Sequence, residues 1–455
     1  MSYAGKTVLV VGLARSGMAA SKTLKNLGAR VLANDLKTED QLEKEARELK
    51  AMGVELHLGI KPDGLIDQTD LIVLSPAVPM DASFVQKAIS QGKEVISEVE
   101  LAYRLCRAPI VAITGTNGKT TTTALVGEIL KEAGKTVHVV GNIGVPFVGK
   151  VDEICKEDIV VVEISSFQLE AISQFHPRVC AILNITEDHL DRHKTMENYI
   201  NTKMRIFENC TDTDWLILNG DDDETVKMKE KTQANVLFFS RKHILEQGAW
   251  VEDGQLVVDI GEGKEIVCHV DDIFIPGSHN LENALAATLM ARTLGVSPQS
   301  IASTLRSFRG VEHRIEFVDI IDGVKFYNDS KGTNPEASIK AIQAMKGPTV
   351  LIAGGYDKGS DFSPFIDAFG DTVRHMVVLG KTADKIIKAA QDKGFANVHR
   401  VKTLEEGVVK AFSLAKPGEN VLLSPACASW DMFKDFEERG RVFKEAVKAL
   451  KGEKR

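Results

Sequence analysis

Residues 110–130 read IVAITGTNGKTTTTALVGEIL, in which an apolar strand pattern is followed at once by a glycine-containing loop and an amphipathic helix. Glycines let backbone N–H groups converge at a helix N-terminus, which is an arrangement that binds phosphate. Lys119 can reach terminal phosphates, and the Thr120 hydroxyl can bind Mg²⁺, although Ile113 stands where the GxxxxGK[ST] pattern has its first glycine. A plain structural turn is the alternative. We predict an ATP-binding loop made of Gly115, Thr116, Asn117, Gly118, Lys119, Thr120 and Thr121.

Similar strand and helix patterns extend to both sides of this stretch. Upstream, the apolar run Thr7–Gly12 precedes a helical stretch from Gly17 to about Gly28; downstream, buried-strand patterns recur as VVVE, CAILNI, WLILNG, VLIAGG and VLLSPA. Such alternation is typical of parallel sheets covered by helices. With 455 residues and about 150 residues per domain, the chain should hold roughly three domains. We predict an α/β fold with a Rossmann-like domain at 1–97, a P-loop-type ATP-binding domain at 98–309 and a second Rossmann-like domain at 310–455.

The composition is that of an ordinary globular protein, with 44% hydrophobic and 26% charged residues. The net charge of −8 and the lack of a basic run argue against nucleic-acid binding. The six cysteines are scattered without a CxxC pair, as expected for reduced thiols. The first apolar stretch is too short for a membrane span and leads into a glycine turn. We therefore expect a cytoplasmic monomer that does not bind membranes.

A second glycine turn, GLARSG at residues 12–17, follows the first strand pattern. Asp35 ends the next strand pattern, where a dinucleotide fingerprint places a carboxylate for a ribose hydroxyl. The fingerprint is degraded because Ala14 replaces its second glycine, and a plain strand-to-helix turn explains it equally well. Together with the ATP loop, this turn suggests one site for ATP and another for a nucleotide-bearing substrate.

Acidic residues follow two of the central strand patterns. Glu163 ends the apolar run DIVVVE, and a carboxylate at the carboxyl end of a buried strand needs a partner or a metal ion. The pattern ILNIT then leads into a polar cluster on the same rim, which could be a helix cap or a metal and phosphate site. The cluster consists of Glu187, Asp188, His189 and Asp191.

Beyond these single features, a series of longer stretches together resembles the Mur ligase family over nearly the whole chain. The stretches are TGTNGKTTTT, EISSFQLE, NITEDHLDRH, HNLEN, EHRIEFV, NDSKGTNPEAS and LLSPACASWDMFKDFEERG. The resemblance implies three domains that hold a UDP-linked substrate, ATP and an amino acid in turn. It implies an ATP-dependent carboxylate–amine ligase that adds D-glutamate to UDP-N-acetylmuramoyl-L-alanine through an acyl phosphate, for peptidoglycan synthesis.

The resemblance also implies roles for individual residues. Lys119, His189 and Lys203 would be catalytic, with Lys119 on the ATP phosphates. Two Mg²⁺ ions would be bound by Thr120, Glu163, His189 and Lys203. Further nucleotide contacts would come from Asn280, Asn283, Arg314 and Asp329. The UDP-linked substrate would lie near Arg15, Ser16, Asp35 and Asn142. D-Glutamate would be bound by Thr333, Lys358, Ser429 and Phe436.

Lys203, in NYINTKMRIFENC, falls where the family carries a carbamylated lysine. Its ordinary interpretation is an exposed cation on an amphipathic segment. An ammonium repels Mg²⁺, whereas a carbamate offers the anionic oxygen that a hard cation prefers. Carbamylation requires the neutral amine, so the surroundings of Lys203 must disfavour its charge.

Other functions remain open. A Mur-type or folylpolyglutamate-type ligase for a different amino acid would share the ATP loop and differ in the terminal motifs. A nicotinamide-dependent oxidoreductase would use GLARSG and Asp35 but leave TGTNGKT unexplained. A non-catalytic sensor of UDP-sugars is a third possibility.

Overall fold

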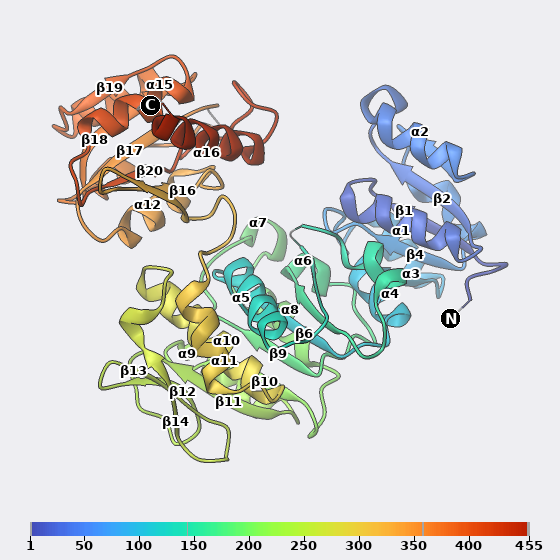
Figure 1. Cartoon of the computed structure of the whole chain (residues 1–455). Helices are drawn as coiled ribbons and strands as arrows, with labels where there is room; N and C mark the ends of the chain where they lie inside the picture. Colours follow the sequence, from blue (N-terminus) through green and yellow to red (C-terminus); the bar gives the residue numbers. More distant parts are fainter. Residues whose placement is uncertain (1, 143, 357–358, 453–455) are drawn as a thin grey trace. The chain divides into compact units, whose positions relative to one another are not determined.

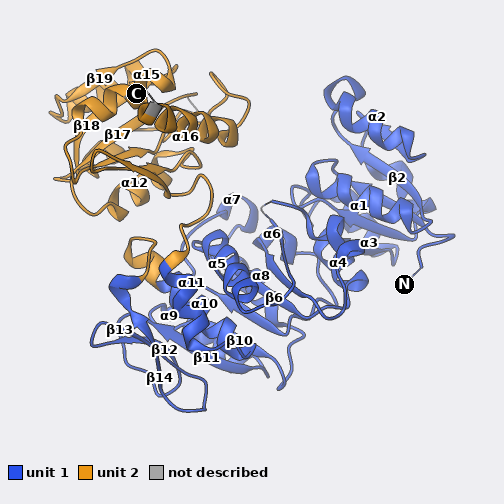
Figure 2. Ribbon diagram, in the orientation of Figure 1, with its two compact units in different colours: residues 1–272, 282–306 blue, residues 273–281, 307–455 orange. Residues whose placement is uncertain are grey.

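The structure is a computed structural model that describes residues 2–142, 144–356 and 359–452. The chain folds around three β-sheets (Figure 1). It divides into two compact units, one made of residues 1–272 with 282–306 and the other of residues 273–281 with 307–455 (Figure 2). We refer to them as unit 1 and unit 2 and describe each by itself.

The first sheet of unit 1 has five parallel strands in the order β3-β2-β1-β4-β5. Its apolar strands are buried, as expected where helices cover a parallel sheet. The strands are β1 (Thr7–Val11), β2 (Arg30–Asp35), β3 (Glu55–Leu58), β4 (Leu71–Leu74) and β5 (Glu94–Ser97). The helices are α1 (Arg15–Asn26), η1 (Glu39–Leu42), α2 (Glu43–Ala51), η2 (Pro62–Gln68) and α3 (Ser83–Ser90).

The central sheet of unit 1 has nine strands in the order β14-β13-β12-β11-β10-β9-β6-β8-β7. All its neighbouring strands are parallel except for the antiparallel pairs β12–β13 and β13–β14. The strands are β6 (Ile110–Thr114), β7 (Val137–Gly141), β8 (Ile159–Glu163), β9 (Val179–Ile182), β10 (Trp215–Asn219), β11 (Asn235–Ser240), β12 (Gly248–Glu252), β13 (Gln255–Asp259) and β14 (Glu265–His269).

Helices of the central region precede, connect and follow these strands. They are α4 (Glu98–Leu105), α5 (Lys119–Glu132), η3 (Phe147–Glu153), α6 (Ser166–Leu169), α7 (Leu190–His193), α8 (Met196–Met204), η4 (Arg205–Phe207), α9 (Asp223–Val226), η5 (Lys227–Lys231), η6 (Val270–Asp272), α10 (Ser278–Thr293) and α11 (Pro298–Ser307). The N-terminal turn of α10 belongs to unit 2 and the rest of this helix to unit 1.

Unit 2 contains a six-stranded sheet in the order β15-β16-β20-β17-β18-β19, parallel except for the pair β15–β16. Its strands are β15 (Glu316–Ile321), β16 (Val324–Asn328), β17 (Thr349–Gly354), β18 (Val373–Leu379), β19 (Val398–Arg400) and β20 (Asn420–Leu423). Its other helices are α12 (Pro335–Ala344), α13 (Ser363–Asp367), α14 (Ala383–Asp392), α15 (Leu404–Leu414) and α16 (Phe436–Gly452). Successive side chains of a strand point to opposite faces of the sheet, and one hydrophobic cluster lies on each face. For example, Leu351 of β17 belongs to one cluster and Ile352 to the other.

The predicted three-domain α/β fold is confirmed by these three sheets. The first and central sheets nevertheless share one hydrophobic cluster, which contains Val10, Ile96, Ala112 and Val162. This continuous core explains why both sheets belong to a single compact unit. The domain boundaries at 97/98 and 309/310 stay predictions.

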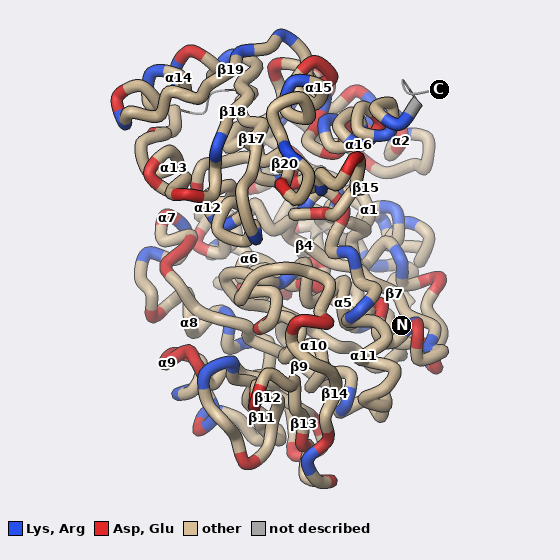
Figure 3. Tube along the Cα trace, turned by 60° about the vertical axis from the view of Figure 1, so that its left-hand side comes forward, with Lys and Arg blue, Asp and Glu red and all other residues tan. Residues whose placement is uncertain are grey.

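Acidic and basic residues are interspersed along the elements of each unit (Figure 3). Over the described ranges, every helix is too short or too polar to cross a membrane.

Candidate functional site

The predicted ATP loop connects the end of β6 to the start of α5. Gly118 is the N-cap residue of α5 and has a φ of +85°, a left-handed conformation that glycine adopts without strain. A Cβ atom on Gly118 would lie 2.3 Å from Oδ1 of Asn283, and one on Gly115 would lie 3.1 Å from the Leu183 backbone nitrogen. Both positions are therefore tightly packed and have backbone conformations that favour glycine.

Lys119 is the first residue of α5, and its side chain bends back over the loop. Its Nζ atom donates to the carbonyl oxygens of Gly115 at 2.9 Å and Thr116 at 2.8 Å. Neutral carbonyls orient an ammonium group without cancelling its charge. The loop therefore presents a fixed cation next to the N-terminus of a helix, where phosphate is favoured.

Hydrogen bonds to neighbouring segments hold the loop in place. The Asn117 N–H donates to Asn184 Oδ1 at 2.8 Å, and Asn184 Nδ2 donates back to the Asn117 carbonyl at 3.1 Å. The Thr116 hydroxyl donates to the Thr186 carbonyl at 3.1 Å and lies 3.1 Å from the Tyr199 hydroxyl. These bonds link the loop to the segment after β9 and to α8, and they fix the loop's shape before any ligand binds.

Lys203 lies on α8 with only 1% of its surface exposed, so its ordinary interpretation as a surface cation is wrong. Its Nζ donates to the Gly115 carbonyl at 2.8 Å and lies 4.7 Å from the centre of the Tyr199 ring. Burial, and then the positive charge of Lys119, lower the pKa of Lys203 well below its usual value. The structure thus brings the predicted lysine to the ATP loop in surroundings that favour the neutral amine.

Glu163 is the last residue of β8, and Ile113 at the end of β6 is its register partner. The carboxylate is only 2% exposed and accepts a hydrogen bond from Asn142 Nδ2 at 3.0 Å. No basic side chain among the described residues pairs with it. A buried carboxylate without a cation is costly, so this donor set suits a divalent metal ion together with the buried hydroxyl-bearing Thr120 on α5.

His189 precedes α7 with a φ of +53°. Its side chain is 46% exposed and lies 3.4 Å from Asp188, and its ring is 4.8 Å from that of Phe167. Within the described part of the chain, no group of three or more histidine, cysteine, aspartate or glutamate side chains is close enough to hold a metal ion. His189 is therefore not part of such a group among the described residues.

The two asparagines predicted to contact the nucleotide both lie on α10. Asn283, in unit 1, accepts a hydrogen bond from the Thr122 hydroxyl of α5 at 3.1 Å and so lies beside the ATP loop. Asn280 belongs to unit 2 and donates to the Pro276 carbonyl at 2.6 Å.

The remaining predicted residues of the C-terminal part belong to unit 2. Asp329 is buried, accepts a hydrogen bond from the Ser424 hydroxyl at 2.6 Å, and has its pKa raised to about 7 by burial. The charge of Arg314 acts on Asp329 in the opposite direction. Ser429 is buried, while Phe436 begins α16 with its carbonyl bonded to the Ser330 hydroxyl at 2.8 Å. The other two predicted D-glutamate residues are Thr333, which is half-buried, and Lys358, which lies outside the described residues.

The predicted nucleotide turn GLARSG connects β1 to α1. Arg15 is exposed and Ser16 half-buried at the first turn of α1. The Asp35 carboxylate accepts hydrogen bonds from the Leu13 N–H at 2.7 Å and the Lys37 N–H at 2.9 Å. Asp35 therefore shapes the turn itself. Asn142 follows β7 and donates a hydrogen bond to Glu163.

Sequence reasoning missed three residues that the structure places around the site: Asn184, Tyr199 and Arg192. Helical spacing could have found Tyr199, because a residue four positions before Lys203 lies on the same helix face. The contacts of Asn184 and Arg192 join segments far apart in the sequence, so no local pattern signals them.

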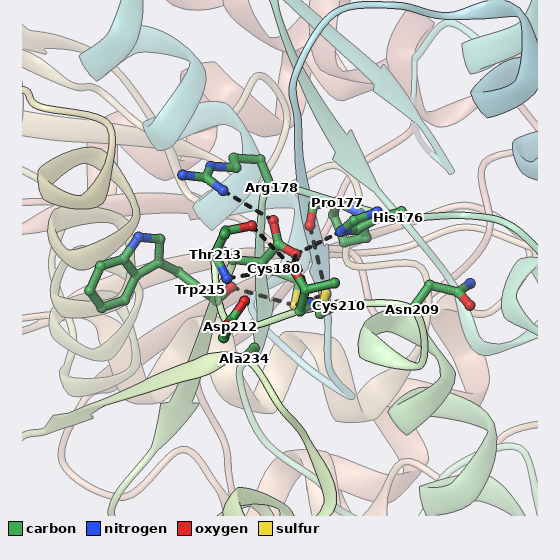
Figure 4. Close-up of polar contacts among 12 residues, drawn as sticks. His176, Pro177, Arg178, Cys180, Asn209, Cys210, Asp212, Thr213, Trp215 and Ala234 are labelled. Atoms are coloured by element: carbon green, nitrogen blue, oxygen red, sulfur yellow. Dashed lines mark hydrogen bonds and ion pairs between the residues drawn. The ribbon is translucent and has the colours of Figure 1, made fainter.

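A cleft of about 540 Å³ lies at the amino ends of strands β6, β9 and β10, away from the predicted ATP loop at the carboxyl end of β6. There the Asp214 carboxylate lies 2.6 Å from His176 Nε2 and 3.4 Å from Arg178, and the thiols of Cys180 and Cys210 are 3.9 Å apart (Figure 4). These side chains contact one another near the amino ends of the strands. These contacts connect the segments that enter β9 and β10.

The parallel strands end at a loop that contains glycines and Lys119, beside the buried carboxylate of Glu163 and the buried Lys203. This combination defines an α/β enzyme that acts on nucleotide phosphates. The family patterns for the MurD-like N-terminal domain, the Mur ligase middle domain and the Mur ligase glutamate ligase domain match residues 6–97, 113–291 and 313–427. The chain belongs to the Mur ligase family.

Individual relatives are similar over their whole length. UDP-N-acetylmuramoylalanine--D-glutamate ligase of Thermoanaerobacter sp. is 52% identical over 453 residues, covering 99% of this chain and 100% of the relative. The protein of the same name from Clostridioides difficile is 46% identical with the same coverage.

Solved structures of more distant family members share the fold. UDP-N-acetylmuramate-alanine ligase MurC from Thermotoga maritima has a TM-score of 0.59 at 20% identity, with 98% of this chain and 100% of that chain covered. MurF from Acinetobacter baumannii has a TM-score of 0.62 at 18% identity, with 92% and 91% covered.

Proposed function

We propose that this protein is the ATP-dependent ligase that joins D-glutamate to UDP-N-acetylmuramoyl-L-alanine in peptidoglycan precursor synthesis. Relatives at 46–52% identity carry this activity in their names and match the chain from end to end. The observation that carries the proposal at the site is the buried Lys203, bonded to the same loop that presents Lys119. The family uses ATP, and this loop is where its phosphates bind.

The reaction has two steps. A carboxylate oxygen of the UDP-linked substrate attacks the γ-phosphorus of ATP, so that ADP leaves and an acyl phosphate forms. The amine of D-glutamate then attacks the acyl carbon, loses a proton, and expels inorganic phosphate. The protein contributes mainly by positioning groups and balancing charge. Lys119 and the N–H groups at the start of α5 neutralise the charge that develops on the transferred phosphoryl group.

We further propose that two Mg²⁺ ions bind at this site through Thr120, Glu163, His189 and Lys203, the last as its carbamate. Bound Mg²⁺ would supply positive charge that stabilises the phosphates during transfer. The burial of Lys203 and its lowered pKa support carbamylation, because only the neutral amine reacts with CO₂. Glu163 would also orient the Asn142 side chain, which donates a hydrogen bond to it at 3.0 Å.

The remaining contacts are proposed from the motif matches. For the nucleotide, the matches assign Gly115, Thr116, Asn117, Gly118 and Thr121 of the loop, and separately Asn280, Asn283, Arg314 and Asp329. Arg15, Ser16, Asp35 and Asn142 serve the UDP-linked substrate; Thr333, Lys358, Ser429 and Phe436 serve D-glutamate. The three functional domains divide at 97/98 and 309/310. We propose that the protein acts as a monomer in the cytoplasm, and its six free cysteines suit a reducing compartment.

Phosphate release by the purified protein tests the function. With ATP, Mg²⁺ and UDP-N-acetylmuramoyl-L-alanine, release should require D-glutamate and should not be supported by glycine or L-lysine. Lys119→Ala should lower turnover by about 10²-fold or more, because a preorganised cation is removed. Lys131→Ala, which changes an exposed lysine on the same helix, is the matched control. Equal rates with another amino acid would falsify the D-glutamate assignment.

A further inference from the structure

The strand order of the first sheet reverses between β1 and β4. From β1 the chain passes to β2 and β3 on one side of the sheet, whereas β4 and β5 lie on the other side. In open parallel sheets, ligands bind outside the carboxyl ends of strands at such a reversal of strand order. The two loops at this reversal are the turn at residues 12–17, which follows β1, and the segment at residues 75–79, which follows β4 and which we call the wall loop.

The wall loop packs closely against the glycine turn. Gly12 has a φ of +88°, and a Cβ atom there would lie 2.8 Å from Ser75 Cβ and 3.4 Å from a methyl group of Val78. The Ser75 N–H bonds to the Val11 carbonyl at 2.9 Å, which fixes the start of the wall loop on the sheet. Ser75 and Val78 of the wall loop therefore pack directly against the glycine turn.

A side chain from the central region holds the other end of the wall loop. Arg192, on α7, donates to the carbonyl oxygens of Val78 at 3.0 Å and Ala77 at 3.4 Å. The same guanidinium bonds to both carboxylate oxygens of Glu170, at 2.5 and 3.1 Å, and lies 5.2 Å from the centre of the Phe167 ring. The Arg192 side chain is only 16% exposed, and its contacts with the wall loop, Glu170 and Phe167 fix its orientation. We call Arg192 the brace, because it holds the wall loop rigidly.

Arg192 also connects the wall loop to the segment of unit 1 that carries His189. The Phe167 ring that stacks under Arg192 contacts the rings of His189, at 4.8 Å, and His193, at 5.7 Å. We infer that Arg192 is a positioning residue for the nucleoside diphosphate end of the substrate: it holds the wall loop in its binding shape from the segment that carries His189. This inference rests on the proposed function, which supplies the UDP-linked substrate.

Kinetics of Arg192→Gln test the inference. The variant keeps the size of the side chain but loses the charge and most of the donors. The KM for the UDP-linked substrate, and the Kd for uridine diphosphate measured by calorimetry, should rise about tenfold, as for the loss of a charged hydrogen bond. The KM for ATP and kcat should stay within about twofold. Arg192→Lys, which keeps one donor group, should shift the same two constants about threefold and serves if the glutamine variant does not fold.

Thr23→Val is the matched control. Thr23 on α1 donates its hydroxyl to the Val148 carbonyl at 3.0 Å, a second tie between the first sheet's domain and the central region, away from the wall loop. It should leave every constant unchanged. The inference is overturned if Arg192→Gln leaves the KM for the UDP-linked substrate unchanged, if it affects ATP equally, or if Thr23→Val gives the same shift. Failure of the wild-type protein to release phosphate with D-glutamate would instead contradict the proposed function, and uridine diphosphate binding would still test the brace.

Discussion

At the scale of single residues, burial gives Lys203 its chemistry. A lysine is rarely buried unless it is paired, yet Lys203 bonds to a loop carbonyl and lies near the cation Lys119. Both the low-polarity surroundings and the like charge disfavour its ammonium form. The same position that would destabilise a cation would stabilise an uncharged amine ready to take up CO₂.

Substitutions of Lys203 should separate charge from carbamylation. Lys203→Arg keeps the positive charge but cannot form the carbamate, so we expect it to be nearly inactive in phosphate release. Lys203→Ala should regain part of its activity when acetate is added, because a small carboxylate can supply the missing oxygen ligand. Lys131→Arg, at an exposed position on α5, should be fully active. Full activity of Lys203→Arg would exclude the carbamate.

At the scale of elements, the junction of β6 and α5 is shaped by its glycines. Gly118 ends the loop in a left-handed conformation and brings the first turn of α5 against Asn283 of α10. Glycine adopts this conformation without strain, whereas a side chain at this position would be strained and would crowd the Asn283 side chain.

Gly118→Ala should therefore weaken ATP binding. The substitution forces an alanine into a left-handed conformation, at a cost of about 1 kcal/mol, and places its Cβ 2.3 Å from Asn283 Oδ1. We expect the KM for ATP to rise about tenfold or more. Gly134→Ala, after the C-terminal end of α5, has a similar φ of +78° with no atom within 4 Å of the added carbon. This control should lose some stability at an unchanged KM, and an unchanged KM for both variants would contradict the role of Gly118.

At the scale of the molecule, unit 1 is held together by polar groups buried between the first sheet's domain and the central region. Glu98, the first residue of α4, accepts hydrogen bonds from Gln168 Nε2 at 3.0 Å and the Val148 N–H at 3.4 Å. Burial raises the pKa of Glu98 to about 7. Its protonation state therefore couples the packing of unit 1 to pH.

The direction of this coupling is testable. Because the pKa is higher in the folded than in the unfolded protein, the folded state binds the proton more tightly, and stability falls as pH rises from about 4.5 to about 7. The buried Asp329 of unit 2 acts in the same direction, so a variant is needed to isolate Glu98. Glu98→Gln should gain stability relative to the wild type between pH 5 and 8, by at most about 3 kcal/mol in chemical denaturation. A difference that does not change with pH would contradict this.

The sequence by itself determined the local elements and the chemistry of the ATP loop. Alternating apolar runs and glycine turns predict parallel strands and helices because periodicity and backbone freedom are local properties. The strand, loop and helix around Gly118 and Lys119 are continuous in the chain, so their arrangement could be predicted and was found. The family's motifs added the substrates, which no pattern of strands and helices specifies.

Only the tertiary structure determined which residues that are far apart in the sequence lie close together in space. The segment around Lys203 is compatible with an exposed helix until α8 packs against the ATP loop and removes its water. The Asp35 carboxylate accepts hydrogen bonds from the N–H groups of Leu13 and Lys37, and the contact with Leu13, 22 residues away, appears only in the folded turn. The brace from Arg192 to the wall loop crosses more than a hundred residues of chain. Burial, pKa shifts and such long-range contacts arise from packing between segments, and local sequence carries no signal of them.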